Sequence, residues 1–237
     1  MIQRQQDKGK VDIQNQSQYA PLYFSLGYNC VSSLSELIQL IGPQIQQAVE
    51  GILQSLLPQL NLISIVYTGQ IPKAAQSYDQ EYGINTAMSH VMAVAECISL
   101  IALIFPSPTV QTLNNQKFIE QWIVSLRSKC EKTDIIHVQS VRGICAAIKA
   151  EPAVMCQNFN QLLQLLLSIV PGRLMYGNNQ VKNAVLEEVK GVLIGLRDAM
   201  VQQPAQQATG SLWGQYAGAL GDSYKQVLEK IYGIPSQ

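Results

Sequence analysis

The stretch FIEQWIVSLRSKCEKTDIIHVQSVRGICAAIKAEP, residues 118–152, contains two runs of apolar side chains separated by a polar break. In both runs the apolar residues recur three or four positions apart, a spacing that places them on one face of an α-helix. The two runs hold Phe118, Ile119, Trp122, Ile123 and Leu126, and then Val138, Val141, Ile144, Cys145 and Ile148. Asp134 is the predicted N-cap of the second helix, and Pro152 fits the first turn of a third. The stretch therefore predicts a helix, a short break and another helix.

The same pattern continues toward the N-terminus, where proline and glycine interrupt it. Gly42-Pro43 is predicted to end one helix and begin the next, Pro58 to end or kink that second helix, and Pro106-Ser107-Pro108 to break a third. Residues 67–83 show no sustained period and are predicted to be a loop insertion, and the polar residues 1–19 a frayed or disordered leader. The helices expected before residue 130 span about 34–41, 43–57, 85–104 and 115–126.

Toward the C-terminus the pattern repeats with similar punctuation. A helix that begins at Pro152 is predicted to close at Pro171-Gly172, and Asn178 or Asn179 is predicted to cap the next. No run of alternating apolar and polar residues indicates a sheet. The remaining segments are a helix over 180–201, a linker over 202–210 and two short amphipathic segments over 212–220 and 224–232.

Helix pairs that recur about every 40–50 residues are typical of stacked repeats. Each pair alone exposes an apolar face, which the next pair covers. The sequence thus predicts an all-α fold: a HEAT-type α-solenoid of antiparallel helix pairs over residues 20–237, with about four to five pairs. A non-repeating helical bundle is the alternative architecture.

The composition excludes several classes of function. Hydrophobic residues make up 47% of the chain and charged residues 14%, and glutamine (30 residues) supplies the remaining polarity. Sixteen basic and sixteen acidic residues cancel, so no electrostatic steering of nucleic acid is expected. The five cysteines are scattered, which is typical of buried thiols in a reducing compartment. The apolar run Val91–Phe105 contains Glu96 and is expected to be a buried helix rather than a membrane span.

Catalytic and metal-binding motifs are missing from the sequence. His90 and His137 have no cysteine or second histidine one helical turn away, and no nucleotide-binding or nucleophile-elbow motif is present. Glu187-Glu188 are adjacent on a helix, so they diverge by about 100° and are predicted to lie on a solvated face. We therefore expect no enzymatic activity, no metal and no cofactor, although an enzyme with a hidden site stays a minor alternative.

Three further sets of residues are expected to support packing. Gly191 and Gly195 are predicted to allow close approach of two helices, and Arg127 and Arg142 to pair with carboxylates of adjacent helices. The core or inter-helix aromatic residues are predicted to be Phe118, Trp122, Trp213 and Tyr232.

The strings Phe118-Ile119-x-x-Trp122-x-x-Ser125-Leu126-Arg127 and Arg142-Gly143-Ile144-Cys145 resemble the C-terminal HEAT repeats of transportin, a karyopherin-β nuclear import receptor. The end of the chain, Trp213 and then Tyr232-Gly233-Ile234, is similar to the family's closing helix and tail. The resemblance runs from about Tyr28 to Ile234, with an interruption near residues 67–83. It covers the last few repeats of a much longer receptor.

This resemblance implies a right-handed superhelix that binds extended nuclear-localisation peptides of cargo proteins on its concave side. The implied location is the cytoplasm and nucleus, with nuclear pore proteins as further candidate partners. Ran would bind through N-terminal repeats that this chain lacks, and neither nucleic acid nor membrane insertion is implied.

At the cargo site the resemblance assigns peptide contacts to Asn85 and Met88. The family's pocket tryptophan corresponds to Ser32, a loss of apolar wall worth about 2–4 kcal/mol. A helical-repeat scaffold for protein–protein interaction, without transport activity, is the alternative function.

Overall fold

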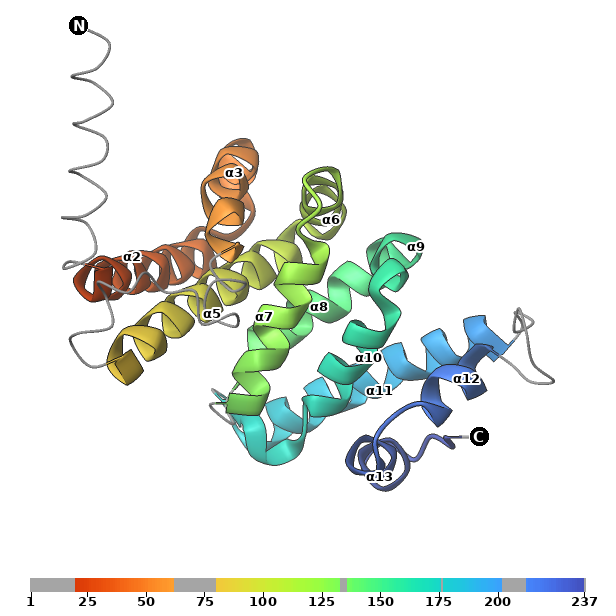
Figure 1. Ribbon diagram of the computed structural model, residues 1–237. Coiled ribbons are helices and arrows are strands. Elements are labelled where there is room, and N and C mark those ends of the chain that lie inside the picture. The colour runs from red at the N-terminus through yellow and green to blue at the C-terminus, as the bar shows by residue number, and fades with distance from the viewer. Residues whose placement is uncertain (1–19, 62–79, 133–135, 176, 202–211, 237) are drawn as a thin grey trace, which may run out of the picture.

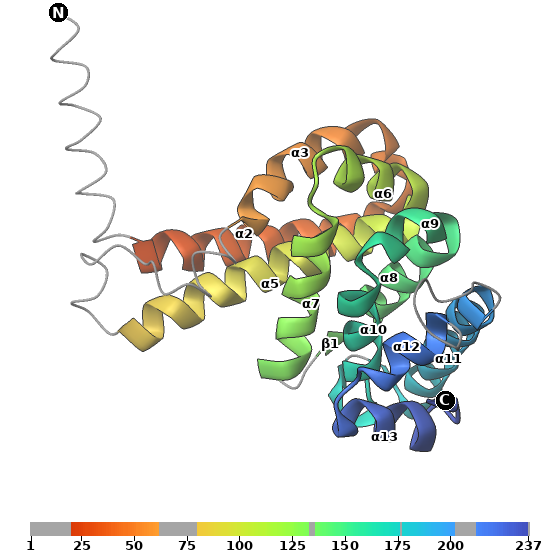
Figure 2. The same cartoon turned by 45° about the vertical axis from the view of Figure 1, so that its right-hand side comes forward.

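The chain forms α-helices arranged in two layers in a computed structural model, which describes residues 20–61, 80–132, 136–175, 177–201 and 212–236 (Figure 1). In the first layer each helix lies beside the next one along the chain, and Figures 1 and 2 show this succession from two directions. The first layer consists of α2 (Ala20–Ile41), α5 (Gln80–Ile104), α8 (Val138–Ala150) and α11 (Asn179–Val201). The all-α class expected from the sequence is confirmed.

The second layer consists of the segments that connect these helices and of the two helices that follow α11. Its members also contact one another, and all of them except α13, which packs on α10, lie against a helix of the first layer. They are η2 (Gly42–Ala48) with α3 (Val49–Leu60), α6 (Pro106–Asn115) with α7 (Ile119–Lys132), α9 (Pro152–Met155) with η4 (Cys156–Asn158) and α10 (Phe159–Ser168), and finally α12 (Leu212–Gly218) and α13 (Asp222–Lys230).

Two crossings from the first layer to the second use the same one-residue turn. Phe105 joins α5 to α6 with φ −129° and ψ 67°, and Glu151 joins α8 to α9 with φ −136° and ψ 60°. In both cases a proline follows, and its ring keeps the preceding residue out of the helical region. The earlier crossing uses Gly42, whose φ of +57° ends α2 in a left-handed conformation that favours glycine.

Several predicted boundaries need correction. Pro106-Ser107-Pro108 does not merely break a helix; it starts α6, because proline fits the first turn, where its missing amide would be unpaired. Residues 80–83 belong to α5 rather than to the expected loop. The helix expected from Pro152 is divided at η4, and the one expected from Pro43 begins as the 3₁₀ segment η2. The predicted leader over 1–19, the linker over 202–210 and the cap Asp134 lie outside the described residues.

The core of the described residues centres on a contact among α5, α7 and α8 that we call the Ser99 junction (Ala95, Ser99, Trp122 and Gly143). Trp122 is fully buried, and its indole Nε1 donates to the Ala95 carbonyl at 3.0 Å and to Ser99 Oγ at 3.2 Å. A Cβ placed on Gly143 would lie 1.9 Å from the Ser99 carbonyl oxygen. The glycine therefore lets the backbone of α8 touch that of α5.

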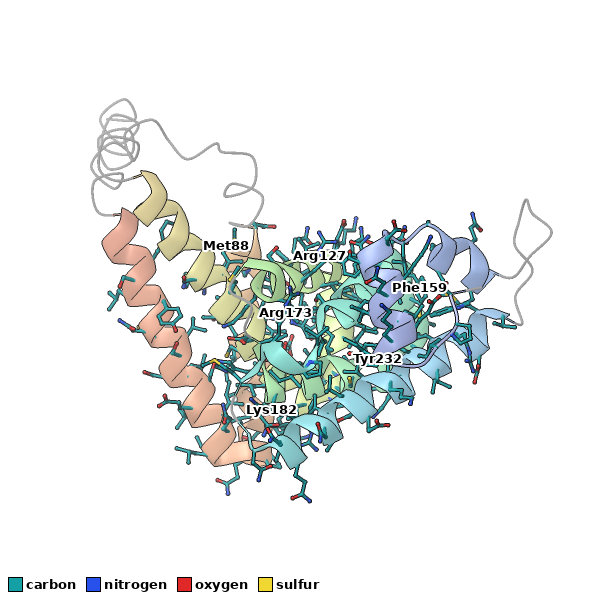
Figure 3. The ribbon with its side chains drawn as sticks, turned by 90° about the horizontal axis from the view of Figure 1, so that it is seen from below. Met88, Arg127, Phe159, Arg173, Lys182 and Tyr232 are labelled. Atoms are coloured by element: carbon teal, nitrogen blue, oxygen red, sulfur yellow. The ribbon has the colours of Figure 1, made fainter. Side chains whose placement is uncertain are left out.

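The last helices are held by aromatic side chains that Figure 3 shows in part. Tyr232 is buried, and its hydroxyl donates to the Ile169 carbonyl at the end of α10. Trp213 is buried against Phe159, with ring centroids 6.5 Å apart, and its Nε1 donates to the Pro235 carbonyl at 3.3 Å. The predicted burial of Trp122, Trp213 and Tyr232 is confirmed, whereas Phe118 is half-buried.

Two short features fix where α8 and α11 begin. Asn178 caps α11, because its Oδ1 accepts the amide of Val181 at 2.9 Å. Strands β1 (Ile136–His137) and β2 (Leu174–Met175) form a parallel pair that ties the start of α8 to the η5 segment (Pro171–Arg173) before α11. The sequence predicted no sheet and a helical His137, because two-residue strands leave no alternating pattern.

Helix α5 contains an apolar window, Ala87–Ile104, that is long and apolar enough to cross a membrane by length and composition. Its mean hydropathy is 1.9, yet 83% of the window is buried inside the fold. This burial is what a core helix with neighbours on several sides requires, and it agrees with the interpretation of the apolar run as a buried helix.

Candidate peptide-binding surface

The surface to which the resemblance assigns cargo binding belongs to the first layer. On α2, Ser32 is half-buried and Glu36 is exposed, one turn apart on the same helix face. On α5, Ser89 is exposed, and Ala93 and Leu100 on its stripe are 7% and 5% exposed. Of these three α5 residues only Ser89 is exposed, so this part of the layer offers the Ser89 hydroxyl on α5 and the Glu36 carboxylate on α2.

The structure separates the two residues assigned to peptide contact. Asn85 lies within α5, but its side chain is outside what the structure describes. Met88 is 5% exposed and belongs to a small cluster with Ala87 and Met92, against which Phe24 of α2 packs (Figure 3). In this arrangement Met88 contributes to the packing of α2 on α5, and a peptide would reach it only at its edge.

An ion cluster bridges α8 and α11 on the same layer. Glu188 accepts a hydrogen bond from Lys149 Nζ at 2.9 Å, and its other oxygen lies 3.6 Å from Arg142 Nε. The Arg142 and Lys149 side chains are 47% and 55% exposed, so the pairs fix geometry and add little stability. The expected pairing of Arg142 with an adjacent helix is confirmed. Glu188 bridges α11 to α8, a role that its position beside Glu187 in the sequence did not predict.

Arg127 provides a second test of the expected pairing. It lies on α7, and its guanidinium donates to the side-chain oxygen of Gln164 on α10. The contact joins two adjacent second-layer helices, and the partner in this hydrogen bond is an amide oxygen.

A buried carboxylate connects α5 to the end of α7 and the start of α8. Glu96 is 7% exposed, accepts from Lys129 Nζ at 2.5 Å and from the His137 amide at 3.3 Å, and lies 4.0 Å from His137 Nδ1. Burial lowers the pKa of His137 below its ordinary value; Glu96 opposes this effect and Lys129 adds to it. An acidic residue within an apolar run is the sequence signal for such a site, because a buried carboxylate needs partners that offset the loss of its hydration.

A groove lies between the layers at the other end of the chain. Its volume is about 690 Å³, and α8, α9, α11 and α12 line it with mainly apolar side chains. Gly191 and Gly195 are part of this lining, and a Cβ on either would meet no atom of the described residues within 4 Å. The prediction that these glycines allow close helix packing is therefore wrong for the described part of the chain, where no neighbouring backbone approaches them.

The thiols and the titratable groups show no catalytic arrangement among the described residues. Cys97, Cys130 and Cys145 are buried as expected, Cys156 is intermediate, and Cys30 is exposed, contrary to the expectation. Burial raises the pKa of Cys97 to about 11 and that of Cys145 to about 12, which leaves both as protonated, unreactive thiols. In the described part of the chain, no three His, Cys, Asp or Glu side chains are placed to hold a metal.

Comparison of the chain with protein-family models, with curated proteins and with solved structures gives no match.

Proposed function

We propose that this chain is a transportin-like α-solenoid segment that binds extended nuclear-localisation peptides of cargo proteins. The observation that carries the proposal is the position of the residues through which the chain resembles that family. Trp122 and Gly143 meet at the Ser99 junction, and Tyr232 joins α13 to the end of α10. These residues specify how successive helix pairs pack, so the resemblance lies in the contacts that build the stack.

In a stack of this kind, the first layer forms one continuous wall. α2, α5, α8 and α11 lie side by side there, while the second layer supplies the turns and the outer helices. Such a wall suits an extended peptide, because consecutive helices offer side chains at regular intervals along its length. Glu36 gives the wall a negative charge near the predicted cargo site, which favours a basic peptide.

The test is a titration of a fluorescent basic peptide that ends in a proline-tyrosine pair, followed by anisotropy. Saturable binding is expected, weakened by Asn85→Ala and lost when alanines replace the proline and tyrosine of the peptide. A peptide that does not saturate at high micromolar protein, with the protein folded by circular dichroism, would contradict direct cargo recognition.

Ser32→Trp provides a sharper version of this test. An indole at this position restores apolar wall worth about 2–4 kcal/mol, which corresponds to a gain in affinity of at least about 30-fold. Ser55→Trp is the matched control, because Ser55 is exposed on α3 in the second layer. Equal peptide affinities of Ser32→Trp and Ser55→Trp would show that α2 does not contribute to a peptide pocket.

The alternative, a scaffold for other protein partners, is favoured by one observation. Met88 is committed to the packing of α2 on α5, so this predicted peptide contact is largely covered. In that case neither the original chain nor Ser32→Trp binds the peptide, and affinity capture yields a stable partner without Ran or pore proteins.

A further inference from the structure

A buried histidine joins the N-terminal half of α2 to α5. His90 of α5 is 2% exposed, and its ring lies against Gly27 of α2. A Cβ placed on Gly27 would be only 2.8 Å from His90 Cε1, so the imidazole touches the α2 backbone. One turn earlier on α2, the Phe24 ring has its centroid 6.1 Å from that of the imidazole. The histidine ring is therefore an integral part of the contact between the two helices.

The imidazole is only partly satisfied in this position. Nδ1 of His90 is buried, and no described residue forms a hydrogen bond with it. A neutral ring tolerates such a site, because one of its two nitrogens carries no hydrogen. A second proton would give both nitrogens a hydrogen and would add a full charge in a place that excludes water. Protonation of the ring is therefore unfavourable as long as α2 stays in contact with it.

The charges around the contact do not offset a protonated ring. The titratable groups on α2 and on this side of the fold are Tyr28, Cys30, Glu36, Glu96, Cys97, Lys129 and His137. Glu36 is the single charged residue of α2, and it lies about 13 Å along the helix axis from Gly27. Glu96 is bonded to Lys129 and points about 120° away from His90 around α5. No described carboxylate is therefore placed to pair with the imidazole.

The two halves of α2 are anchored differently. Between Phe24 and Cys30 none of the side chains is fully buried, whereas Val31 and Ile38 are 5% and 0% exposed and belong to the main core. Phe24 packs instead on a small separate cluster of Ala87, Met88 and Met92. The N-terminal half of the helix can consequently separate from α5 without disturbing the main core, as a local opening.

We propose that protonation of His90 releases the N-terminal half of α2, residues 20–30, from α5, while Val31 and the residues after it stay in place. Burial lowers the pKa of His90 below its ordinary value of 6.5, and a weaker hydrogen bond with the Gly27 backbone opposes this effect. Opening returns the ring to water and restores its ordinary proton affinity. The open form therefore gains population as the pH falls through 6.5, and it takes Phe24 away from the Met88 cluster.

The first test is hydrogen–deuterium exchange of the full chain at pH 7.5 and at pH 5.0, corrected for the intrinsic exchange rate. Protection of amides 24–30 should fall at least about fivefold between the two pH values. At pH 5.0 these amides should exchange at least about tenfold faster than amides 32–41. Protection of residues 24–30 that does not change with pH would overturn the proposal, as would equal protection of the two halves at pH 5.0.

The second test identifies the titrating group. His90→Leu should abolish the pH response of amides 24–30, because leucine fills the site without taking up a proton. His137→Leu is the matched control, since His137 is the other histidine of the chain, and this variant should keep the response. A full response in His90→Leu would overturn the proposal.

A measurement on the unmodified chain covers the case in which His90→Leu does not fold. The carbon and proton resonances of the two imidazole rings report the protonation of each histidine, and the signal lost in His137→Leu identifies that of His90. The His90 ring should titrate with the same midpoint as the loss of protection at residues 24–30. A ring that takes up its proton while these amides stay protected would show that protonation does not release α2.

Discussion

Two adjacent helices of the first layer, α8 and α11, use glycine in opposite ways. Gly143 of α8 lies against the Ser99 carbonyl of α5, where a Cβ would be only 1.9 Å away from the oxygen. Gly191 and Gly195 of α11 face the groove, where a Cβ would meet no described atom within 4 Å. The α5–α8 contact therefore depends on backbone touching backbone, whereas α11 has glycines that its packing does not need.

The Ser99 junction and the α8–α11 contact also differ in the interactions that stabilise them. The Ser99 junction is buried and joins three helices by side-chain and backbone contact. The α8–α11 contact carries the exposed cations of Arg142 and Lys149 on the half-buried Glu188, and it is open at the groove. Substitutions at the junction should consequently cost far more than substitutions near the groove.

The largest expected effect is that of Trp122→Ala. Removing a fully buried indole leaves a cavity and takes its hydrogen bonds from Ser99 Oγ and from the Ala95 carbonyl, which still accepts from the Ser99 hydroxyl. The free energy of unfolding should therefore fall by about 3–5 kcal/mol. Urea titration followed by circular dichroism measures the change. Trp122→Phe is the control for the hydrogen bonds and should cost about 1–3 kcal/mol. A loss below about 1 kcal/mol for the alanine variant would show that the junction is not central to the core.

Gly143→Ala is expected to cost about 3 kcal/mol, although it adds a single methyl group. The methyl cannot be accommodated by a side-chain rotation, because the atom it meets belongs to the backbone of α5, so the two helices must separate. The same urea titration applies, with Gly191→Ala as the matched control. Equal stabilities of the two variants would contradict the comparison from which this prediction starts.

His90, at the contact of α2 with α5, makes stability depend on pH. Burial lowers the pKa of His90 below 6.5, and a weaker, opposing effect comes from a hydrogen bond with the Gly27 backbone. The unfolded chain therefore binds more protons near and below pH 6.5, so this contribution to stability is complete above that pH and is lost as the pH falls through it.

The measurement is the urea midpoint at pH 7.5 and at pH 5.5. The midpoint should be lower at pH 5.5, and His90→Leu should reduce the difference. Part of the difference in midpoint should remain in this variant, because burial also lowers the pKa of His137. A midpoint that rises on acidification would show that the sign is wrong.

The sequence was informative where local physics decides the structure. Apolar spacing predicted most of the helices, Asn178 was a predicted cap, and the buried indoles and phenol were expected. Prediction from the sequence failed where one residue type is compatible with two local structures. Pro106 and Pro152 both follow the same one-residue turn and both begin a helix, yet a helix start was predicted only at Pro152.

The candidate site was harder to predict than the fold. Helical spacing tells which residues share a face, but α5 is buried on nearly all sides, so the period could not show that Met88 faces α2 rather than solvent. The same limit applies to Gly191 and Gly195. Their spacing places them on one face, and only the position of the neighbouring helices determines whether that face is covered.

The smallest expected effect, and the one that most directly tests the comparison, is that of alanine at the two open glycines. Gly191→Ala and Gly195→Ala should each raise the free energy of unfolding by about 0.5–1 kcal/mol, because alanine reduces the freedom of the unfolded chain and the added methyl meets no atom. A small upward shift of the urea midpoint checks this. If either variant instead loses stability, the groove is filled in solution, and α11 resembles α8 more closely than its open glycines indicate.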